Sequence, residues 1–346
     1  MRSMKNIFEL SGVKYGIPAE YKGTGRDDVK LLSIDPISGK YSRTKFAGIG
    51  NHLSSGDTLV FNNSMIVPSS FKLYSTRQKK YVTVNIGYSE SGYIAEFRDI
   101  NKAVEKGERF IFSDMSYLEA GEPLEQFPRY RNIILSDNFN LEIEEKAIGR
   151  YIKYEDRMPD FPESTYRNVY ATVPGSVEYP SASRPFTEYI IDELKRKGVN
   201  MVNITLHCNL GSLDATEFTG KGRLLPEYYN VSDESAFILN RALELGGRII
   251  AVGTTAVRAM ATVYDGRFNP GSGYTDIFIN QNTETGVDGL ITGMHDPTTS
   301  HIKLLEAFVD ISLLESAYET GIDSGFAWEE FGDSTMILPH LKHKIK

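Results

Sequence analysis

The segment RIIAVGTTAVRAM, residues 248–260, decides how the C-terminal half of this chain folds. Residues 248–252 form a short apolar run rich in β-branched side chains, which predicts a buried strand. The tripeptide Gly-Thr-Thr interrupts this run, and the apolar spacing from Ala256 onward predicts a helix. Such a junction leaves backbone N–H groups and two hydroxyls at a helix N-terminus, where an anionic or polar ligand group binds favourably. The alternative is a purely structural turn, because every α/β domain contains such junctions.

Predicted strands and helices alternate on the N-terminal side of this segment. Residues 187–197 form a predicted helix with Thr187 as N-cap and Gly198 as its stop, and residues 199–206 form a predicted strand. Ser232 caps a second predicted helix, which runs to Leu245 and ends at a Gly-Gly pair before the strand at 248–252. This alternation predicts a largely parallel, helix-covered sheet.

A β-rich stretch separates the N-terminal residues from this α/β pattern. Strand candidates occur at 29–34 and 57–62, and a series of short alternating runs follows at 81–87, 93–98, 108–112, 131–135, 141–144 and 151–154. Residues 114–120 are an ambiguous helix candidate. Many short strands at such spacing predict an all-β barrel or sandwich. We therefore expect an α/β domain formed by residues 1–66 and 157–346, with an inserted all-β barrel-like domain at residues 67–156.

The composition is that of an ordinary globular protein. The 346 residues include 40% hydrophobic and 24% charged residues, and no apolar run approaches the roughly 20 residues of a membrane span. A single cysteine excludes an internal disulfide, and the six scattered histidines have no metal-ligand spacing. We expect a cytoplasmic monomer without membrane contact. The net charge of −8 argues against general affinity for nucleic acids, although a local basic patch could still bind a structured RNA.

Polar residues follow four of the predicted apolar strands. If these strands are parallel, their carboxyl ends meet at one edge of the sheet, where α/β proteins commonly form binding sites. The polar residues are Asn62-Asn63-Ser64, His207 to Ser212, Gly253-Thr254-Thr255 with Arg258 one turn later, and Thr292 to Pro297 with His295. This convergence predicts a polar pocket.

Each of these residues has a structural alternative. The two asparagines could form an ordinary turn, His207 could be a hydrogen-bonded core residue, and His295 could open a turn. Arg258 could form a structural salt bridge. For Cys208 we favour a small buried hydrophobic residue over a reactive thiol. The sequence has no GxSxG, Walker, HExxH or GxGxxG motif to support hydrolase, phosphate-loop or zinc chemistry.

Two motifs, DTLVFNN at 57–63 and RIIAVGTTAVR at 248–258, are the most specific in the chain. Through these motifs, and across nearly its whole length, the chain resembles the S-adenosylmethionine:tRNA ribosyltransferase-isomerase family of queuosine biosynthesis. Further matches in the family's order and spacing are 31–35 with Pro68, 166–175, 180–186, 198–211, 275–279, 287–297, 307–308 and 331–333. The family's fold, an α/β domain with an inserted β-barrel, agrees with the division expected above.

The resemblance implies a reaction. The family uses S-adenosylmethionine as a ribosyl donor and co-substrate, and it has no prosthetic group. The acceptor is a tRNA that carries 7-aminomethyl-7-deazaguanine at the wobble position. The product is epoxyqueuosine-tRNA, with adenine and methionine released. The sulfonium makes the adjacent ribose carbon acidic, so a positioned base can begin the rearrangement.

The resemblance also implies which residues form the site. Proton transfer is assigned to His207, because an imidazole titrates near neutral pH. Arg258 is expected to hold a carboxylate, either that of the donor or that of a neighbouring acid, and His295 is a third catalytic candidate. The substrate-binding candidates are Asn62, Asn63, Ser181, Gly211, Glu227, Thr254, Thr255 and Asp333. His207 and Arg258 are expected to face the same cleft as Asn63, Thr254 and His295.

Departures from the family pattern leave alternatives open. Ser64-Met65 replaces a Thr-Arg pair, Ser70 replaces an arginine, and the segment at 180–186 lacks a family histidine. Because phosphate contacts usually need Lys or Arg, a diverged paralogue that transfers the ribosyl group to a small molecule or to water is one alternative. A non-catalytic protein that retains the nucleoside pocket is another.

Overall fold

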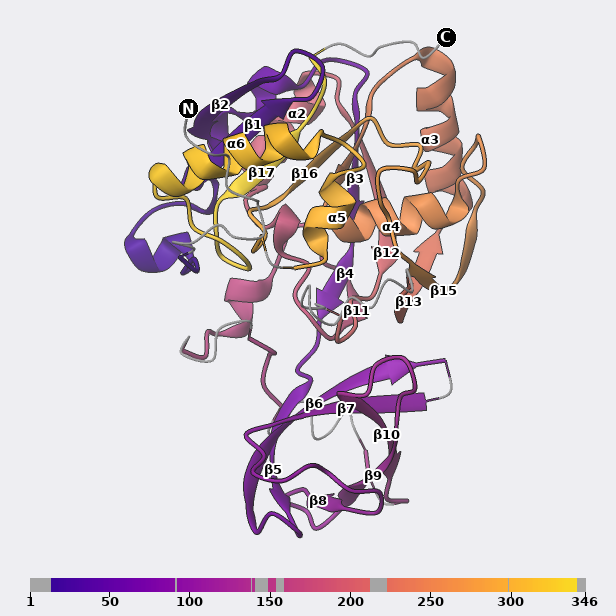
Figure 1. Ribbon diagram of the computed structural model, residues 1–346. Helices are drawn as coiled ribbons and strands as arrows, with labels where there is room; N and C mark the ends of the chain where they lie inside the picture. Colours follow the sequence, from indigo (N-terminus) through magenta and orange to yellow (C-terminus); the bar gives the residue numbers. More distant parts are fainter. Residues whose placement is uncertain are drawn as a thin grey trace.

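The computed structural model describes residues 14–90, 92–137, 139–140, 149–153, 159–211, 223–297 and 299–340. A nine-stranded sheet has the order β15-β13-β12-β3-β14-β16-β17-β1-β2. These strands are β15 (Gly271–Ile277), β13 (Arg223–Val231), β12 (Asn200–Leu206), β3 (Thr58–Asn62), β14 (Ile249–Val252), β16 (Gly289–Gly293), β17 (Ser334–Ile337), β1 (Lys30–Asp35) and β2 (Lys40–Lys45). Figure 1 shows this sheet with helices packed around it.

The four strands whose ends were expected to converge are neighbours in this sheet. The pairs β12–β3, β3–β14 and β14–β16 are all parallel, so the carboxyl ends of the four strands lie along one edge. Most of the outer pairs are antiparallel: β13 and β15 join β12 in antiparallel order, β16 pairs antiparallel with β17, and β1 pairs antiparallel with β2. The exception is β1, which pairs in parallel with β17. The α/β class is confirmed, and the parallel arrangement is concentrated at the centre of the sheet.

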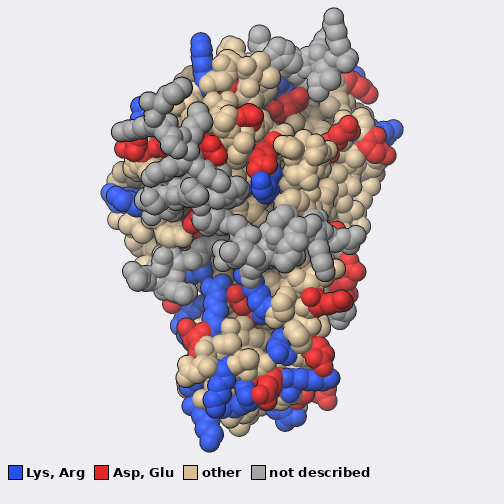
Figure 2. Space-filling view, in the orientation of Figure 1, with Lys and Arg blue, Asp and Glu red and all other residues tan. Residues whose placement is uncertain are grey.

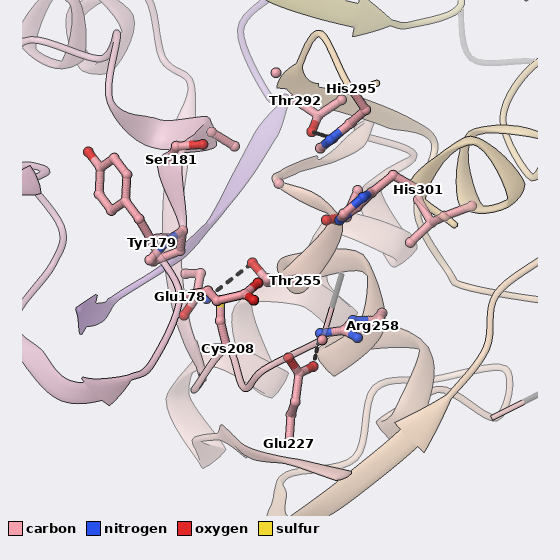
Figure 3. A pocket seen from close by; sticks show the side chains of 18 of the residues that line it. Glu178, Tyr179, Ser181, Cys208, Glu227, Thr255, Arg258, Thr292, His295 and His301 are labelled. Carbon is pink, nitrogen blue, oxygen red and sulfur yellow. Dashed lines mark hydrogen bonds and ion pairs between the residues drawn. The ribbon is translucent and has the colours of Figure 1, made fainter. Parts of the chain in front are cut away.

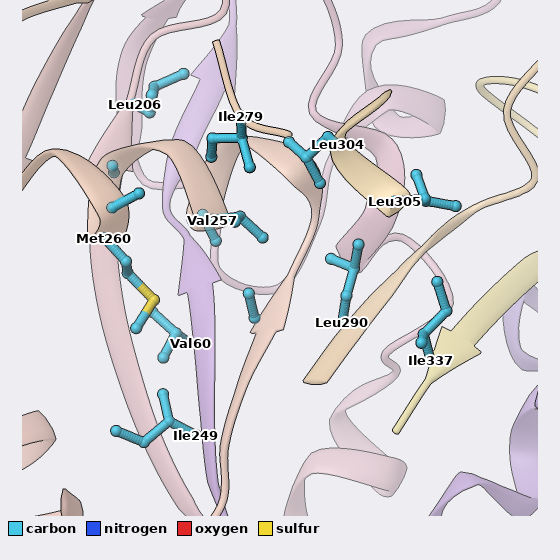
Figure 4. Packing of buried hydrophobic residues seen from close by; sticks show 14 of the residues in the cluster. Val60, Leu206, Ile249, Val257, Met260, Ile279, Leu290, Leu304, Leu305 and Ile337 are labelled. Atoms are coloured by element: carbon cyan, nitrogen blue, oxygen red, sulfur yellow. The ribbon is translucent and has the colours of Figure 1, made fainter. Parts of the chain in front are cut away.

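Helices cover both faces of the sheet because its central strands are apolar on both sides. Alternate residues of β14 enter opposite cores: Ile249 lies in one and Ile250 in the other. The first core, seen in Figure 4, is closed by α3 (Asp233–Leu245), α4 (Thr254–Val263), α5 (His301–Leu305) and α6 (Ile311–Asp323). The second is closed by α2 (Glu188–Arg196) and the 3₁₀ segment η4 (Phe46–His52).

The helix boundaries follow the expected capping residues. The Thr187 side chain accepts a hydrogen bond from the Ile190 N–H at the start of α2, and Ser232 accepts one from the Ser235 N–H at the start of α3. Helix α3 ends at Gly246, whose φ of 73° is the left-handed conformation that glycine adopts without steric cost. None of the helices within the described residues is long and apolar enough to cross a membrane.

The β-rich stretch forms a closed barrel with strand order β10-β7-β6-β5-β8-β9, which lies below the sheet in Figure 1. Its strands are β5 (Ser70–Ser75), β6 (Lys80–Ser89), β7 (Gly92–Arg98), β8 (Arg109–Ile111), β9 (Tyr117–Pro123) and β10 (Tyr130–Leu135). A core that includes Phe71, Val82, Val84 and Leu118 fills it. Where the chain enters and leaves this region, β4 (Ser64–Ile66) pairs in parallel with β11 (Val173–Ser176).

One ambiguous candidate in this region is resolved, and one prediction was wrong. Residues 114–120, the ambiguous helix candidate, do not form a helix: a turn leads into β9, whose alternating buried and partly buried side chains match a barrel wall. The predicted strand at 151–154 is not seen over residues 151–153, although Arg150 forms an isolated bridge with Ser70. The strand predicted at 141–144 and residue 154 lie outside the described residues. The proposed domain limits at residues 66 and 156 remain predictions.

Candidate active site

A cavity lies at the carboxyl ends of the four central parallel strands, as the polar strand ends predicted. Eight of the predicted site residues line it: Asn62, Ser181, Gly211, Glu227, Thr254, Thr255, Arg258 and His295. The wall also includes Glu178, Cys208, Thr292 and His301, which are labelled in Figure 3, together with Glu329 and Glu330. Residues separated by more than 250 positions in the sequence therefore meet in one cavity.

The Gly-Thr-Thr junction brings the start of α4 to the cavity. Gly253 has a φ of 98°, a conformation that favours glycine, and a Cβ at this position would also be in tight contact, 3.2 Å from the Cβ of Ala182. Its N–H donates to the Ile291 carbonyl across the sheet at 2.8 Å. No side chain caps α4, so its first N–H groups and the positive end of its dipole face the cavity wall at Thr254 and Thr255.

Asn62 connects three elements at the edge of the cavity. Its Nδ2 donates to the Leu206 carbonyl at 2.8 Å and to Thr255 Oγ1 at 3.1 Å. Its Oδ1 accepts from the N–H groups of Leu206 and Ser64, each at 3.0 Å. The amide therefore ties the ends of β3 and β12 to the first turn of α4. Asn62 is buried, and these four bonds use its hydrogen-bonding groups for positioning.

Arg258 and Glu227 form an ion pair inside the cavity (Figure 3). Arg258 lies one turn into α4, and Glu227 lies on β13, where its Oε1 also accepts the Asn209 N–H at 3.0 Å. Both side chains are largely buried, so each charge depends on the other for compensation. Of the two carboxylates that the sequence suggested for Arg258, the structure shows the neighbouring acid.

Two neutral histidines stack on another wall of the cavity. The rings of His295 and His301 are almost parallel, with centroids 4.3 Å apart. Burial lowers the pKa of His301 to about 4 and holds the pKa of His295 well below its usual value, so both imidazoles are uncharged near neutral pH. His295 Nε2 lies 2.7 Å from Thr292 Oγ1, whereas its buried Nδ1 has no hydrogen-bond partner among the described residues.

Carboxyl groups outnumber cationic side chains around the cavity. Among the described residues, Glu178, Glu227, Glu329 and Glu330 line it together with one guanidinium, that of Arg258. Burial raises the pKa of Glu329 to about 7 and holds the pKa of Glu330 well above its usual value. A bound cation would pair with these carboxyl groups and lower their pKa values, whereas an anion would add a further unfavourable negative charge beside them.

Glu329 and Glu330 differ in their hydrogen bonds. Glu329 Oε1 accepts the Asp296 N–H at 2.5 Å, and Glu329 has a φ of 65°, a left-handed conformation that non-glycine residues rarely adopt. Such strain persists where the surrounding structure enforces it, which is common at functional sites. Glu330 Oε1 is buried and has no hydrogen-bond partner among the described residues. A buried acceptor of this kind is free to accept a hydrogen bond from a water molecule or from a ligand.

Three predicted site residues do not line this cavity. His207 lines a neighbouring pocket, and Asn63 lies on the other side of the sheet edge, where Thr205 Oγ1 donates to its Oδ1 at 2.7 Å. The expectation that both face the same cleft as Arg258 was therefore wrong. The reason is the alternation of side chains along extended backbone, which directs Asn62 and Cys208 into the cavity and their neighbours Asn63 and His207 away from it.

Asp333, the third of these residues, anchors the backbone. Its carboxylate accepts the N–H groups of Lys30 at 2.6 Å and Ala327 at 2.8 Å, and it lies 3.7 Å from the Lys30 ammonium. It thereby holds the segment that follows Glu329 and Glu330 against β1. Cys208 is buried, as expected, and burial raises the pKa of its thiol to about 11, so the thiol stays protonated.

The sequence interpretation missed four ionisable residues of the cavity: Glu178, His301, Glu329 and Glu330. A signal was present for three of them, because Glu178 lies two residues before the motif at 180–186 and the two glutamates directly precede the motif at 331–333. His301 has no comparable signal. Within the described part of the chain, no group of three or more His, Cys, Asp or Glu residues is arranged to hold a metal ion.

Comparisons with known proteins agree with this architecture. The family model described as "Queuosine biosynthesis protein" matches residues 13–337. The S-adenosylmethionine:tRNA ribosyltransferase-isomerase of Staphylococcus epidermidis is 31% identical over 324 residues, covering 90% of this chain and 94% of the relative. The enzyme of the same name from Caldanaerobacter subterraneus is 30% identical over 328 residues, with the same coverage.

Among solved structures, the S-adenosylmethionine tRNA ribosyltransferase of Thermotoga maritima is similar, with a TM-score of 0.50 and 22% identity. The match covers 95% of this chain and 100% of that one. At this identity the likeness concerns the fold. The sequence matches extend over nearly the full length of both this chain and its relatives. This chain therefore belongs to the queuosine biosynthesis protein family, whose members include the S-adenosylmethionine:tRNA ribosyltransferase-isomerases.

Proposed function

We propose that this chain is an S-adenosylmethionine-dependent tRNA ribosyltransferase-isomerase of queuosine biosynthesis. It transfers the ribosyl group of S-adenosylmethionine to the aminomethyl group of 7-aminomethyl-7-deazaguanine in tRNA and isomerises it. Epoxyqueuosine-tRNA, adenine and methionine are the products. Full-length similarity to relatives that bear the enzyme's name supports this function.

The acidic cavity is the observation that supports the donor most directly. S-adenosylmethionine carries a sulfonium and an ammonium group against one carboxylate, so it is a net cation. Of the described residues, four glutamates and one arginine line the cavity, and a cationic ligand complements this excess of carboxyl groups. Glu330, whose buried Oε1 is unpaired among the described residues, is the carboxyl group best placed to pair with a donor cation.

The chemistry requires a base near the donor and a neutral amine on the acceptor. The sulfonium acidifies the neighbouring ribose CH₂, whose proton passes to the base. The acceptor nitrogen then bonds to the ribose carbon that bears adenine, and the glycosidic bond breaks with adenine as leaving group. The deprotonated carbon then bonds to the carbon that now bears the nitrogen, and the bond from that carbon to the ring oxygen breaks. The freed oxygen displaces methionine from the former CH₂ carbon, which closes the epoxide and breaks the carbon–sulfur bond. Glu329 has a pKa of about 7, which suits a carboxylate that accepts a proton near neutral pH.

This function is tested by incubating the purified protein with S-adenosylmethionine and a tRNA bearing 7-aminomethyl-7-deazaguanine. Adenine release is measured by chromatography, and the mass gain of the tRNA by mass spectrometry. We expect one adenine released per modified tRNA, and none with tRNA that has guanine at that position. Adenine release that is independent of tRNA would instead indicate a small-molecule acceptor or water.

A substitution in the cavity connects this reaction to the structure. Glu330→Gln preserves size but removes a carboxyl group that can give up its proton when a cation pairs with it, so we expect the Kd for S-adenosylmethionine to rise by about tenfold, the effect of one charge-assisted hydrogen bond. Glu244→Gln, on the exposed surface of α3, is the matched control and should leave the Kd unchanged. Equal affinities for the two variants in calorimetry would exclude Glu330 from donor binding.

A further inference from the structure

A second pocket lies beside the cavity, at the junction of the sheet and the barrel. It is lined by Tyr88, Gly175, His207, Asn209, Pro226, Glu227, Tyr228 and Tyr274. Tyr88 belongs to barrel strand β6, Tyr228 to β13 and Tyr274 to β15. Three tyrosines, an imidazole and a proline ring give this pocket flat, largely apolar walls, in contrast to the carboxyl-rich cavity.

The rings in this pocket present faces and edges suited to a planar ligand. The rings of His207 and Tyr228 are inclined by 23° with centroids 5.5 Å apart. The Tyr274 ring meets that of Tyr228 edge-on, at 74° and 5.9 Å. Tyr274 is 46% exposed, so the aromatic wall is open to solvent. Burial lowers the pKa of His207, which keeps its imidazole neutral and able to stack without a desolvated charge.

Several contacts hold this pocket in shape. Asn209 Nδ2 donates to the carbonyls of Tyr88 at 2.6 Å and Pro226 at 3.0 Å, and its Oδ1 accepts the Tyr88 N–H at 3.1 Å. These bonds join the barrel wall to β13. A Cβ on Gly175 would lie 2.6 to 2.8 Å from three atoms of the His207 ring, so only glycine allows the ring to occupy its position.

Glu227 belongs to both the pocket and the cavity. Its Oε2 pairs with Arg258 on the cavity side, and its Oε1 accepts the Asn209 N–H. A planar group in the pocket would therefore lie next to a carboxylate that also borders the donor cavity. An amine substituent on that group could bind Glu227 and still face the ribose of the donor.

We propose that this aromatic pocket binds the acceptor nucleobase, a purine-like base turned out of an RNA loop, and that Glu227 holds its aminomethyl group. The inference rests on the function proposed above. Unstacked bases in RNA loops are commonly bound by stacking on aromatic side chains. The acceptor has a flat ring and an amine. The aromatic walls of the pocket can stack on the ring, and the carboxylate of Glu227, at the border of the donor cavity, can bind the amine.

The test is the affinity for a fluorescein-labelled anticodon stem-loop carrying 7-aminomethyl-7-deazaguanine, measured by fluorescence anisotropy without S-adenosylmethionine. The matched ligand has guanine at the same position. Tyr274→Ala should raise the Kd for the modified stem-loop by about 10- to 100-fold, as loss of one base–aromatic stack does, and Tyr274→Phe should restore it. Tyr81→Ala, an exposed tyrosine at the other end of β6, is the control and should change neither affinity.

Glu227→Gln should remove the preference for the aminomethyl base over guanine, because the amide no longer offers a negative charge to the amine. Unchanged affinities in Tyr274→Ala, or a preference that survives Glu227→Gln, would overturn the pocket assignment. Calorimetry with S-adenosylmethionine and the adenine-release assay report on the proposed function separately. If the unsubstituted protein binds the donor and turns over normally, but the Tyr274 and Glu227 variants bind the stem-loops as it does, the pocket assignment is refuted and the proposed function is not.

Discussion

At the scale of single residues, the cavity is distinguished by buried carboxyl groups whose protonation is linked to ligand binding. Glu329 has a pKa raised to about 7, and a neutral carboxyl cannot attract a cation. His295 and His301 have lowered pKa values and stay uncharged above pH 6.5, so they do not titrate in the same range. The pH dependence of donor binding near neutrality therefore reports on the glutamates.

We expect the affinity for S-adenosylmethionine to rise by about tenfold between pH 6 and pH 8, because Glu329 becomes a carboxylate over this interval. Calorimetry in buffers of different ionisation enthalpy should show proton release on binding at pH 6.5. Glu329→Gln should flatten the profile. The stability of the unliganded protein should depend on pH in the opposite direction. Because the pKa of Glu329 is higher in the folded than in the unfolded state, protonation stabilises the folded state at low pH, and this contribution is lost as the pH rises from about 4.5 to 7. A flat binding profile for the unsubstituted protein would contradict this linkage.

The ion pair of Arg258 and Glu227 gives a second expectation at this scale. Arg258→Met leaves the carboxylate of Glu227 buried without a counter-charge, so the free energy of unfolding should fall by about 3 kcal/mol. Adding Glu227→Gln removes the uncompensated buried charge and should recover at least half of the lost free energy of unfolding, whereas turnover should stay low. Urea denaturation and the adenine-release assay measure the two effects. A double variant no more stable than Arg258→Met would show that the pair contributes through packing instead.

At the scale of secondary-structure elements, the site depends on how strand ends are joined to the first turn of α4. Asn62 makes four hydrogen bonds that connect β3, β12 and α4. Because the backbone groups it satisfies are buried, the cost of losing it combines several unpaired donors and acceptors.

Asn62→Ala should therefore lower the free energy of unfolding by about 2 to 4 kcal/mol and weaken donor binding, since the N-terminus of α4 loses its tie to the sheet. Thr187→Ala removes the N-cap of α2, which has no proposed role in the site. It should lower the free energy of unfolding by about 1 kcal/mol without altering donor affinity. Thermal and urea unfolding, followed by calorimetry, compare the two. If Asn62→Ala bound the donor normally, the tie would have only a structural role.

At the scale of the whole molecule, the barrel and the sheet share one pocket and differ in charge. Residues 70–135, which include all six barrel strands, contain ten Lys and Arg against nine Asp and Glu, whereas the chain as a whole has a net charge of −8. Figure 2 shows Lys and Arg side chains over the barrel face in view, mixed with acidic ones. The barrel is thus the less acidic part of the molecule and the more suitable part for contact with RNA phosphates.

Asn209→Ala tests the connection between barrel and sheet. It removes the three side-chain hydrogen bonds to Tyr88 and Pro226 but keeps the backbone N–H that binds Glu227. We expect kcat/KM for the modified tRNA to fall by about tenfold or more, and the Kd for S-adenosylmethionine to stay within about twofold. Steady-state kinetics and calorimetry separate these effects. An equal loss in both would mean that Asn209 supports the cavity rather than the barrel contact.

The sequence by itself determined the elements and their order. Periodicity placed the strands and helices, capping residues such as Thr187 and Ser232 marked their starts, and polar strand ends located the cavity at the carboxyl edge of the sheet. These features are local, so a short window of residues is enough to predict them. Residues 114–120 were an ambiguous helix candidate, and they lie instead in a turn and in strand β9, because closure of the barrel is a non-local event that outweighs local propensity.

Only the tertiary structure decided which side chains share the site. Adjacent residues point to opposite sides of extended backbone, so Asn62 and Cys208 line the cavity while Asn63 and His207 do not. The strained loop at Glu329 places two acidic side chains opposite strand ends that are distant in sequence. Such neighbours are set by strand order and by burial against distant segments, which no local pattern contains. The pKa values of the buried glutamates and histidines follow from that burial, and with them the charge of the site.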